Sequence, residues 1–203
     1  MSIISAFFTM CETKKITFDL TAWLVSRFVP KSRRWAVSKR IKYYPYYYLS
    51  KRRAKPLEKD AEVIKGLEIG GIVSLSGNTY LGCFCNFNGM TIQGAGRVSI
   101  GRYFHSGENC LIITQNHNYE GGAIPYDTSM IVKEVAIKDF VWIGTGVTIL
   151  PGAQIGEGAV IQAGSVVHGV IPDYAIAGGN PCRVFKYRNI EHFEKLKAAG
   201  KFE

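Results

Sequence analysis

The sequence lacks the cysteine spacing of a cross-linked or metal-binding protein. The 203 residues include five cysteines. The number is odd, and no two cysteines form a Cys-x-x-Cys motif. This pattern predicts neither a disulfide framework nor a zinc site, and it favours a reducing compartment.

Long apolar runs are also missing. No segment approaches the run of about 18 apolar residues that indicates a membrane-spanning helix. The first residues lack the basic start and the apolar stretch of a secretory signal. We therefore expect no membrane span and no secretory signal, and we interpret the protein as cytoplasmic.

Acidic residues are absent from one long segment. The chain has 25 Lys and Arg against 16 Asp and Glu, a net charge of +9, and residues 20–57 hold 11 of the basic residues and no acid. The remainder therefore carries 14 basic and 16 acidic residues, or −2. Three interpretations stay open: a solvated arm, contact with an anionic membrane surface beside Trp23 and Phe28, and nucleic-acid binding. The last is the least favoured because no recognised nucleic-acid motif accompanies the charge.

The most regular feature of the chain is a six-residue spacing of large apolar side chains. A second row, two residues earlier, holds smaller residues that include Cys85, and Cys110 occupies an equivalent place. Helices repeat at 3.6 residues and strands at two, whereas a coil that turns a corner every six residues repeats at six. The spacing therefore predicts a solenoid β-helix. The large residues are Ile69, Leu75, Leu81 and Phe87, and then Ile137, Ile143, Ile149, Ile155, Ile161 and Val167.

The spacing also predicts spatial neighbours. Three sixes complete one circuit, so residues 18 apart stack in adjacent coils at about 4.8 Å. The rhythm has one extra residue near positions 93–95 and disappears over about 22 residues after Thr114, which predicts a long loop of the kind that commonly carries function. If that loop replaces no coil residues, two columns follow. The inward column is Phe87, Ser106 and Ile143, and the outward column is Asn86, His105 and Trp142.

Four stretches resemble successive motifs of a known family. They are Asn86-Phe87-Asn88, Val141-Trp142-Ile143-Gly144-Thr145, Ala163-Gly164-Ser165-Val166-Val167 and Gly179-Asn180-Pro181-Cys182-Arg183-Val184. Together they resemble the hexapeptide-repeat acyltransferases, in particular the galactoside and maltose O-acetyltransferases and the polysaccharide O-acetyltransferases. The resemblance implies an all-β, left-handed parallel β-helix, a homotrimer with sites between subunits, and acetyl-CoA as co-substrate. Six-residue spacing by itself does not assign the hand.

Three regions are expected along the chain. Residues 1–65 form a basic, tyrosine-rich and partly helical extension, with a helix over residues 18–28. Residues 66–188 form the β-helix domain with its loop at 114–136. Residues 189–203 form a helix, capped by Asn189 and stopped by Gly200, that covers the open end of the solenoid.

His117, in the long loop, is the candidate catalytic residue. Transfer of an acyl group to a hydroxyl requires a base, and it requires donors that stabilise the oxyanion. Histidine suits the first role because its pKa lies near neutrality, and the resemblance places the catalytic histidine at this position. Neither Glu120 nor Asp127 can be assigned from sequence as the group that orients His117.

The resemblance also assigns binding residues. It implies that Asn88 contacts the acceptor or the acetyl group, although this side chain could instead bridge the backbones of two coils. Trp142, assigned to the substrate site, needs a covering ligand or subunit. Thr145 and Ala163 would approach the pantetheine arm of coenzyme A, although small residues also simply build coils. Arg183 and Lys186 would meet its 3′-phosphate. The Thr-Lys pair of relatives is His168-Gly169 here, so one cationic contact is missing.

These residues predict an acetyl-CoA-dependent O-acetyltransferase that acts on a hydroxyl of a sugar or polysaccharide precursor and requires no metal. Transfer to an amino sugar or another small molecule stays open. A γ-type carbonic anhydrase needs three zinc-binding histidines, and only His105 and His117 lie in the coil and loop region. The alternative that is not an enzyme is a non-catalytic solenoid that binds a partner through its basic N-terminal extension.

Overall fold

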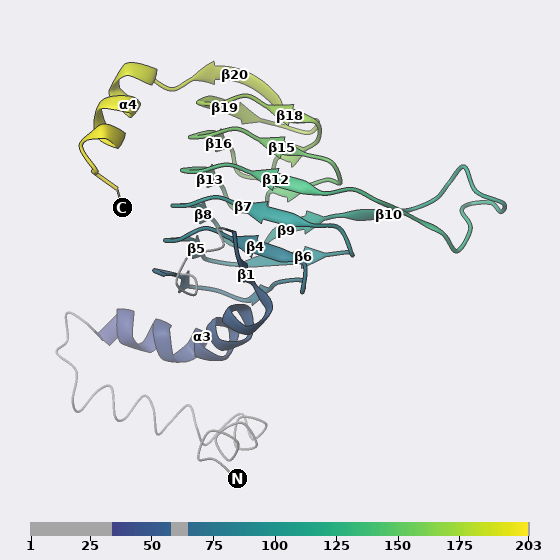
Figure 1. Ribbon diagram of the computed structural model, residues 1–203, viewed down its shortest axis with the longest axis horizontal. Helices are drawn as coiled ribbons and strands as arrows, with labels where there is room; N and C mark the ends of the chain where they lie inside the picture. Colours follow the sequence, from purple (N-terminus) through teal and green to yellow (C-terminus); the bar gives the residue numbers. More distant parts are fainter. Residues whose placement is uncertain (1–33, 58–64, 203) are drawn as a thin grey trace, which may run out of the picture. The chain divides into compact units, whose positions relative to one another are not determined.

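The computed structural model describes residues 34–57 and 65–202. The helix expected over residues 18–28 lies outside the described residues. The chain divides into two compact units, residues 1–44 and 45–203. Helix α3 (Arg34–Arg53) crosses that boundary, and the second unit contains the coil (Figure 1).

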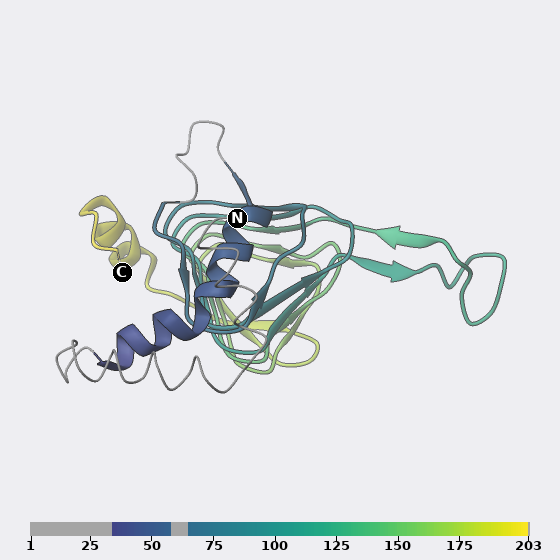
Figure 2. The ribbon, with the colours of Figure 1, turned by 90° about the horizontal axis from the view of Figure 1, so that it is seen from below.

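Three sheets of short strands form the coil. Figure 2 looks along it and shows them enclosing the interior as the sides of a triangle. Sheet A orders β1 (Lys55–Pro56), β4 (Thr79–Leu81), β7 (Val98–Ile100), β12 (Val135–Ile137), β15 (Gln154–Ile155) and β18 (Val170–Ile171). Sheet B orders β2 (Glu68–Ile69), β5 (Asn86–Phe87), β8 (His105–Ser106), β13 (Trp142–Ile143), β16 (Val160–Ile161), β19 (Ala175–Gly178) and β20 (Arg183–Tyr187). Sheet C orders β17 (Val166–Val167), β14 (Thr148–Ile149), β9 (Cys110–Ile113), β6 (Met90–Gln93) and β3 (Val73–Ser74). Sheet A thus begins with β1, which comes from the segment that the sequence assigned to the extension. In the three sheets all neighbouring strands are parallel except β19 and β20 at the end of sheet B.

The interior is filled by the six-residue row. From Ile137 to Val167 each member of the row is at most 3% exposed, and burial of such a side chain contributes about 1.5–3 kcal/mol. Cys85 and Cys110 are buried in the smaller row, as predicted. Burial raises the pKa of the Cys85 thiol to about 12.

Both predicted columns are confirmed by strand register. Phe87 pairs with Ser106, and Ser106 pairs with Ile143, so the long insertion replaces no coil residues. One position earlier, on the outer face of sheet B, Asn86, His105 and Trp142 pair in the same order.

The last coil is shorter than the spacing predicted. Ile155 pairs with Ile171, and Val160 pairs with Ile176, so the separation is 16 residues rather than 18. Pro181 therefore does not follow Ala163 in the stack as expected, because the shorter coil brings Gly179 to that place.

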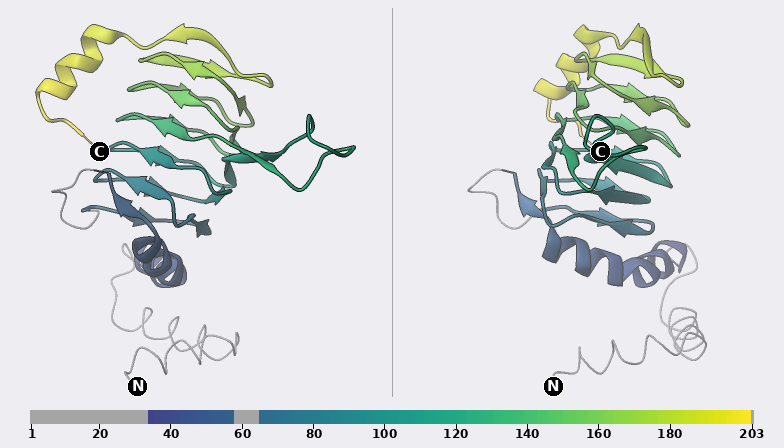
Figure 3. Two further views of the ribbon diagram at one scale, coloured as in Figure 1. Left: turned by 45° about the vertical axis from the view of Figure 1, so that its right-hand side comes forward. Right: turned by 90° about the vertical axis from the view of Figure 1, so that its right-hand side faces the viewer.

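The long insertion is an antiparallel hairpin rather than an unstructured loop. Strands β10 (Gln115–His117) and β11 (Met130–Val132) pair along it. Buried Thr114 stands at its base, where the amide of Lys133 donates to the Thr114 carbonyl at 2.9 Å. This hairpin with its tip, residues 115–132, is called the arm, and it projects away from the sheets (Figures 1 and 3).

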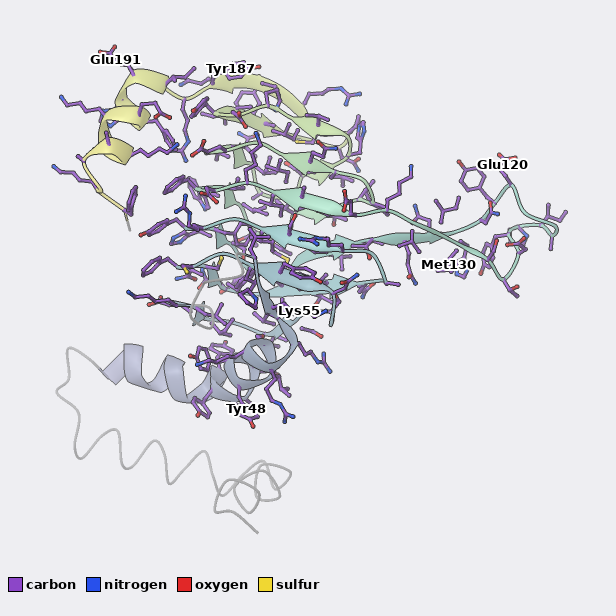
Figure 4. All side chains as sticks on the ribbon, in the orientation of Figure 1. Tyr48, Lys55, Glu120, Met130, Tyr187 and Glu191 are labelled. Carbon is purple, nitrogen blue, oxygen red and sulfur yellow. The ribbon has the colours of Figure 1, made fainter. Side chains whose placement is uncertain are left out.

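The C-terminal helix α4 (Ile190–Ala198) begins where the sequence predicted. The Asn189 side chain accepts from the amide of His192 at 2.9 Å and caps the helix. The expected position across the open end is not what its contacts show, because Phe193 packs against Phe140 and Tyr174 on the side of the coil. Strand β20, which ends at the labelled Tyr187, lies at the end of sheet B (Figure 4). In the part of the chain that is described, no helix has both the length and the apolar character of a membrane span.

Candidate active site

Asn88 lies where the chain leaves sheet B to enter sheet C, a line called the B–C edge. Its amide nitrogen donates to the Ser106 carbonyl of the next coil at 2.9 Å, so the bridging role considered from sequence is present. The coil on the other side approaches closely, because a Cβ on Gly71 would lie 1.5 Å from the Asn88 carbonyl oxygen. Asn88 is therefore held firmly at this edge.

Thr145 and Ala163 lie further along the same edge and are neighbours, as the spacing predicted. The amide of Gly164 donates to the Thr145 carbonyl at 2.8 Å. Both side chains are exposed. The small residues leave the backbone of the edge open to an extended ligand.

Arg183 and Lys186 share one face because of a β-bulge. Three positions apart on a regular strand, they would point to opposite faces. The register between β19 and β20 shifts, so that Lys186 pairs with Ile176 and Arg183 pairs with Gly178. The extra residue restores both basic side chains to the outer face of sheet B.

His168 stands beside Arg183. An Nη1 of Arg183 lies 3.1 Å from Nε2 of His168. The residue that replaces the expected threonine therefore contacts the arginine at the same end of the edge.

Trp142 continues the outward column of sheet B. Its side chain is 56% exposed, so a large apolar ring faces outward beside the B–C edge. Along the column Val160 and Ile176 follow, and Lys186 comes after Ile176. The column thus runs from the tryptophan to one of the two basic residues.

His117 lies at the end of β10, on the arm, and its side chain is exposed. Its ring stacks on that of Tyr126, with centroids 3.9 Å apart and planes 16° from parallel. Glu120 and Met130, labelled in Figure 4, mark the arm on which this pair is carried. No pattern in the sequence indicated a role for Tyr126.

Asp127 organises the tip of the arm. Its carboxylate accepts from the amide of Gly122 at 3.0 Å, and from the amide and the hydroxyl of Ser129. These bonds, led by that of the Ser129 hydroxyl, hold the pKa of Asp127 below its ordinary value. Asp127 therefore shapes the segment that carries Tyr126.

The chain does not bring all candidate residues together by itself. Asn88, Thr145, Ala163 and Arg183 follow the B–C edge, whereas His117 is carried on an arm that leaves the coil after sheet C (Figure 1). Among the described residues there is no group of three or more His, Cys, Asp or Glu side chains that could hold a metal ion.

A cleft of about 1040 Å³ lies between the outer face of sheet B and the C-terminal segment. No sequence pattern predicted this cleft, because periodicity does not indicate where α4 packs. A weaker signal was present in the sequence, since an aromatic residue stands two positions before each of β5, β8 and β13, at Phe84, Tyr103 and Phe140. The lining of the cleft includes Glu68, Asn86, Tyr103, Trp142, Arg188 and Lys201.

This chain is similar in sequence to known proteins. Residues 134–169 match the family model described as bacterial transferase hexapeptide (six repeats). The chain is 35% identical over 122 residues to the galactoside O-acetyltransferase of Lactococcus lactis subsp. lactis (strain IL1403), covering 60% of this chain and 58% of that protein. The chain spans little more than half the length of the curated relatives it matches.

Solved structures share the fold. A maltose O-acetyltransferase from Clostridium difficile 630 superposes with a TM-score of 0.54 at 25% identity, covering 88% of each chain. A hexapeptide-repeat-containing acetyltransferase from Vibrio cholerae O1 biovar eltor, complexed with acetyl coenzyme A, gives 0.51 at 21% identity over 87% of each chain. The predicted left-handed parallel β-helix and the resemblance to hexapeptide-repeat acyltransferases are thus confirmed.

Proposed function

We propose that the protein is an acetyl-CoA-dependent O-acetyltransferase that acts on a hydroxyl of a sugar or polysaccharide precursor. The observation that carries this proposal is the series Asn88, Thr145, Ala163 and Arg183 along one edge of the coil. A long, thin thioester fits such an edge. The similarity to a galactoside O-acetyltransferase supports the same reaction.

In this proposal His117 is the general base. It removes the proton of the acceptor hydroxyl while the oxygen attacks the carbonyl carbon of the acetyl thioester. The new C–O bond forms, the C–S bond breaks, and the proton passes to the departing thiolate. Asn88 positions the reacting groups at the B–C edge.

The carrier would lie along the remaining residues of the edge. Its pantetheine arm passes the backbone at Thr145 and Ala163, where no large side chain intervenes. Arg183 and Lys186 then meet the 3′-phosphate, since guanidinium and ammonium groups bind phosphate through charge-assisted hydrogen bonds. The contact of His168 with Arg183 would help to orient that guanidinium.

The site requires a second copy of the chain. His117 stands on a projecting arm, and Asn88 lies on the coil, so we propose a homotrimer in which the arm of one subunit reaches the B–C edge of the next.

We propose that the enzyme is cytoplasmic and that helix α3, which is rich in basic residues, contacts the inner face of the membrane peripherally. Near the end of the helix, Lys51 lies over the ring of Tyr47 at 5.9 Å, and Arg52 lies over that of Tyr48 at 5.7 Å. Mixed tyrosine and basic surfaces suit an anionic lipid interface. An acceptor sugar carried on a lipid would fit that location.

The test of the function is the replacement His117→Ala. With acetyl-CoA and a panel of sugars, thiol release should fall by about 10²–10⁴-fold, the usual contribution of a general base. His192→Ala, which removes an exposed histidine of α4, is the matched control and should keep full activity. Unchanged turnover in a folded His117→Ala protein would reject the assigned base.

A further inference from the structure

The cleft beside sheet B is a second feature of the site, distinct from the edge that holds the thioester. Its floor is the outward column of sheet B, including Glu68, Asn86 and Trp142. Its other wall is α4 and the residues that follow, which come from the far end of the chain. At about 1040 Å³ it has the size of a small-molecule site.

A stack of aromatic rings makes one side of the cleft rigid. Phe84 and Tyr103 stack with centroids 4.9 Å apart, and Tyr103 and Phe140 stack at 5.3 Å. All three have positive φ, at 60°, 53° and 59°, a conformation that is uncommon for bulky residues. Phe202, from the C-terminal segment, packs against two of these rings. The cleft is therefore held open by packed side chains.

Two polar atoms of the lining are buried without a hydrogen-bond partner in the described part of the chain. They are Oδ1 of Asn86, an acceptor, and Nε of Arg188, a donor. The other end of the Asn86 amide donates to Glu68 at 3.1 Å, which fixes its orientation. A buried polar atom without a partner costs about 1–3 kcal/mol, so both atoms would gain from a polar ligand.

The charges of the lining favour an anion. The basic members are Arg188, Lys197 and Lys201, against the single carboxylate of Glu68. Lys197 is already paired with Glu157, but Arg188 forms no ion pair among the described residues. Its guanidinium lies over the ring of Phe193 at 5.3 Å, which orients it. The guanidinium is thus positioned, charged and available to an incoming anionic group.

The cleft adjoins the proposed place of reaction. Asn86 in its floor lies two residues before Asn88 at the B–C edge, a separation of about 6.6 Å along a strand. Trp142 lies two residues before Gly144 on the same edge. A sugar that offers its hydroxyl at Asn88 can therefore extend its next ring into the cleft.

We propose, resting on the function proposed above, that the cleft binds the part of the acceptor away from the reacting hydroxyl, and that this part is a saccharide bearing an anionic group. Arg188 binds the anion, Asn86 accepts from a sugar hydroxyl, and Trp142 contacts the apolar face of a ring. The anion can be the carboxylate of a uronic acid or the phosphate of a sugar phosphate, and both bind a guanidinium in the same way.

The test compares matched neutral and anionic sugars with the full chain. Cellobiose is compared with its glucuronic-acid counterpart, and glucose with glucose 1-phosphate, by calorimetry without acetyl-CoA and by thiol release with it. In at least one of the two pairs, the anionic sugar should bind at least about tenfold more tightly than its neutral partner. This is the gain expected from one charge-assisted contact. The carboxylate and phosphate arms identify the source of the anion.

Variants assign the effect to Arg188. Arg188→Gln should remove the preference, raising KM for the anionic sugar about tenfold while KM for acetyl-CoA and for the neutral sugar stay within about twofold. Arg188→Lys should restore part of it, and Lys195→Gln, an exposed change on α4, should have no effect. Equal binding of the members of both pairs, or a preference that Arg188→Gln leaves intact, overturns the proposal. Calorimetry measures sugar binding even if no sugar supports thiol release. The proposal for the cleft and the proposed acetyltransferase function can therefore fail separately.

Discussion

The coil and the arm are built on opposite principles. In the coil, apolar side chains such as Ile143 and Ile149 are at most 1% exposed and determine the backbone path by filling the interior. In the arm, Ile124 is 96% exposed, and the path depends on the backbone pairing of β10 with β11, on hydrogen bonds to Asp127 and on one ring stack. Stability and chemistry are therefore separated in this molecule: the coil supplies a rigid edge, and the arm carries the proposed base.

Removal of the same side chain from the coil and from the arm should give the largest difference in stability. Ile143→Ala should destabilise the protein by about 2–5 kcal/mol, because it leaves a cavity in a close-packed interior. Ile124→Ala removes the same atoms from a solvated tip, so we expect a change within about 0.5 kcal/mol. Urea denaturation followed by circular dichroism measures both.

A comparable loss of stability in Ile124→Ala would mean that the tip is packed against another surface in solution, as it would be in the proposed trimer. The denaturation is therefore repeated at two protein concentrations. A concentration-dependent loss would assign the tip to a subunit contact, whereas a concentration-independent loss would contradict the contrast between coil and arm.

The second prediction separates activity from stability within the arm. Tyr126→Ala removes the ring that stacks on His117, and we expect turnover to fall by about 2–10-fold, the value of an aromatic contact of about 0.5–1.5 kcal/mol. The free energy of unfolding should not change. Tyr126→Phe keeps the ring and should keep activity, and Tyr119→Ala removes an exposed ring elsewhere on the arm as a control.

Loss of activity in both Tyr126 variants would assign the effect to the phenol hydroxyl rather than to the stack. A loss in Tyr119→Ala of the same size would show that any apolar deletion from the arm lowers turnover.

The same contrast explains what the sequence could predict. Columns such as Asn86, His105 and Trp142 follow from the spacing once the long loop is taken to replace no coil residues, because every coil repeats the same geometry. The shortened last coil escaped prediction because the spacing changes only after Val167, where no further repeats follow to reveal it.

Features built from non-repeating contacts could not be predicted. The bulge that aligns Arg183 with Lys186 depends on how β20 folds back on β19, and the cleft depends on where α4 packs. Neither follows from a six-residue spacing. The stack of Tyr126 on His117 likewise arises from the turn at the tip of the arm, which has no counterpart elsewhere in the coil.

The smallest expected effect is on the pH dependence of the tip. The pKa of Asp127 is lowered in the folded arm by its bonds to Ser129 and Gly122, so the ionised carboxylate is the form that holds the tip together. A lowered folded-state pKa means that this contribution is fully present above the ordinary aspartate value of about 3.9 and disappears only as pH falls through the lower folded value. The amide chemical shifts of Gly122 and Ser129, followed by NMR, should therefore stay constant on acidification to about pH 4 and change only below it.

Asp127→Asn should abolish that titration and leave the unfolding midpoint unchanged, because the carboxylate packs against no part of the coil interior. Titration of both amides at or above the ordinary value would show that the carboxylate does not organise the tip, and the arm would then need another explanation for how it presents His117.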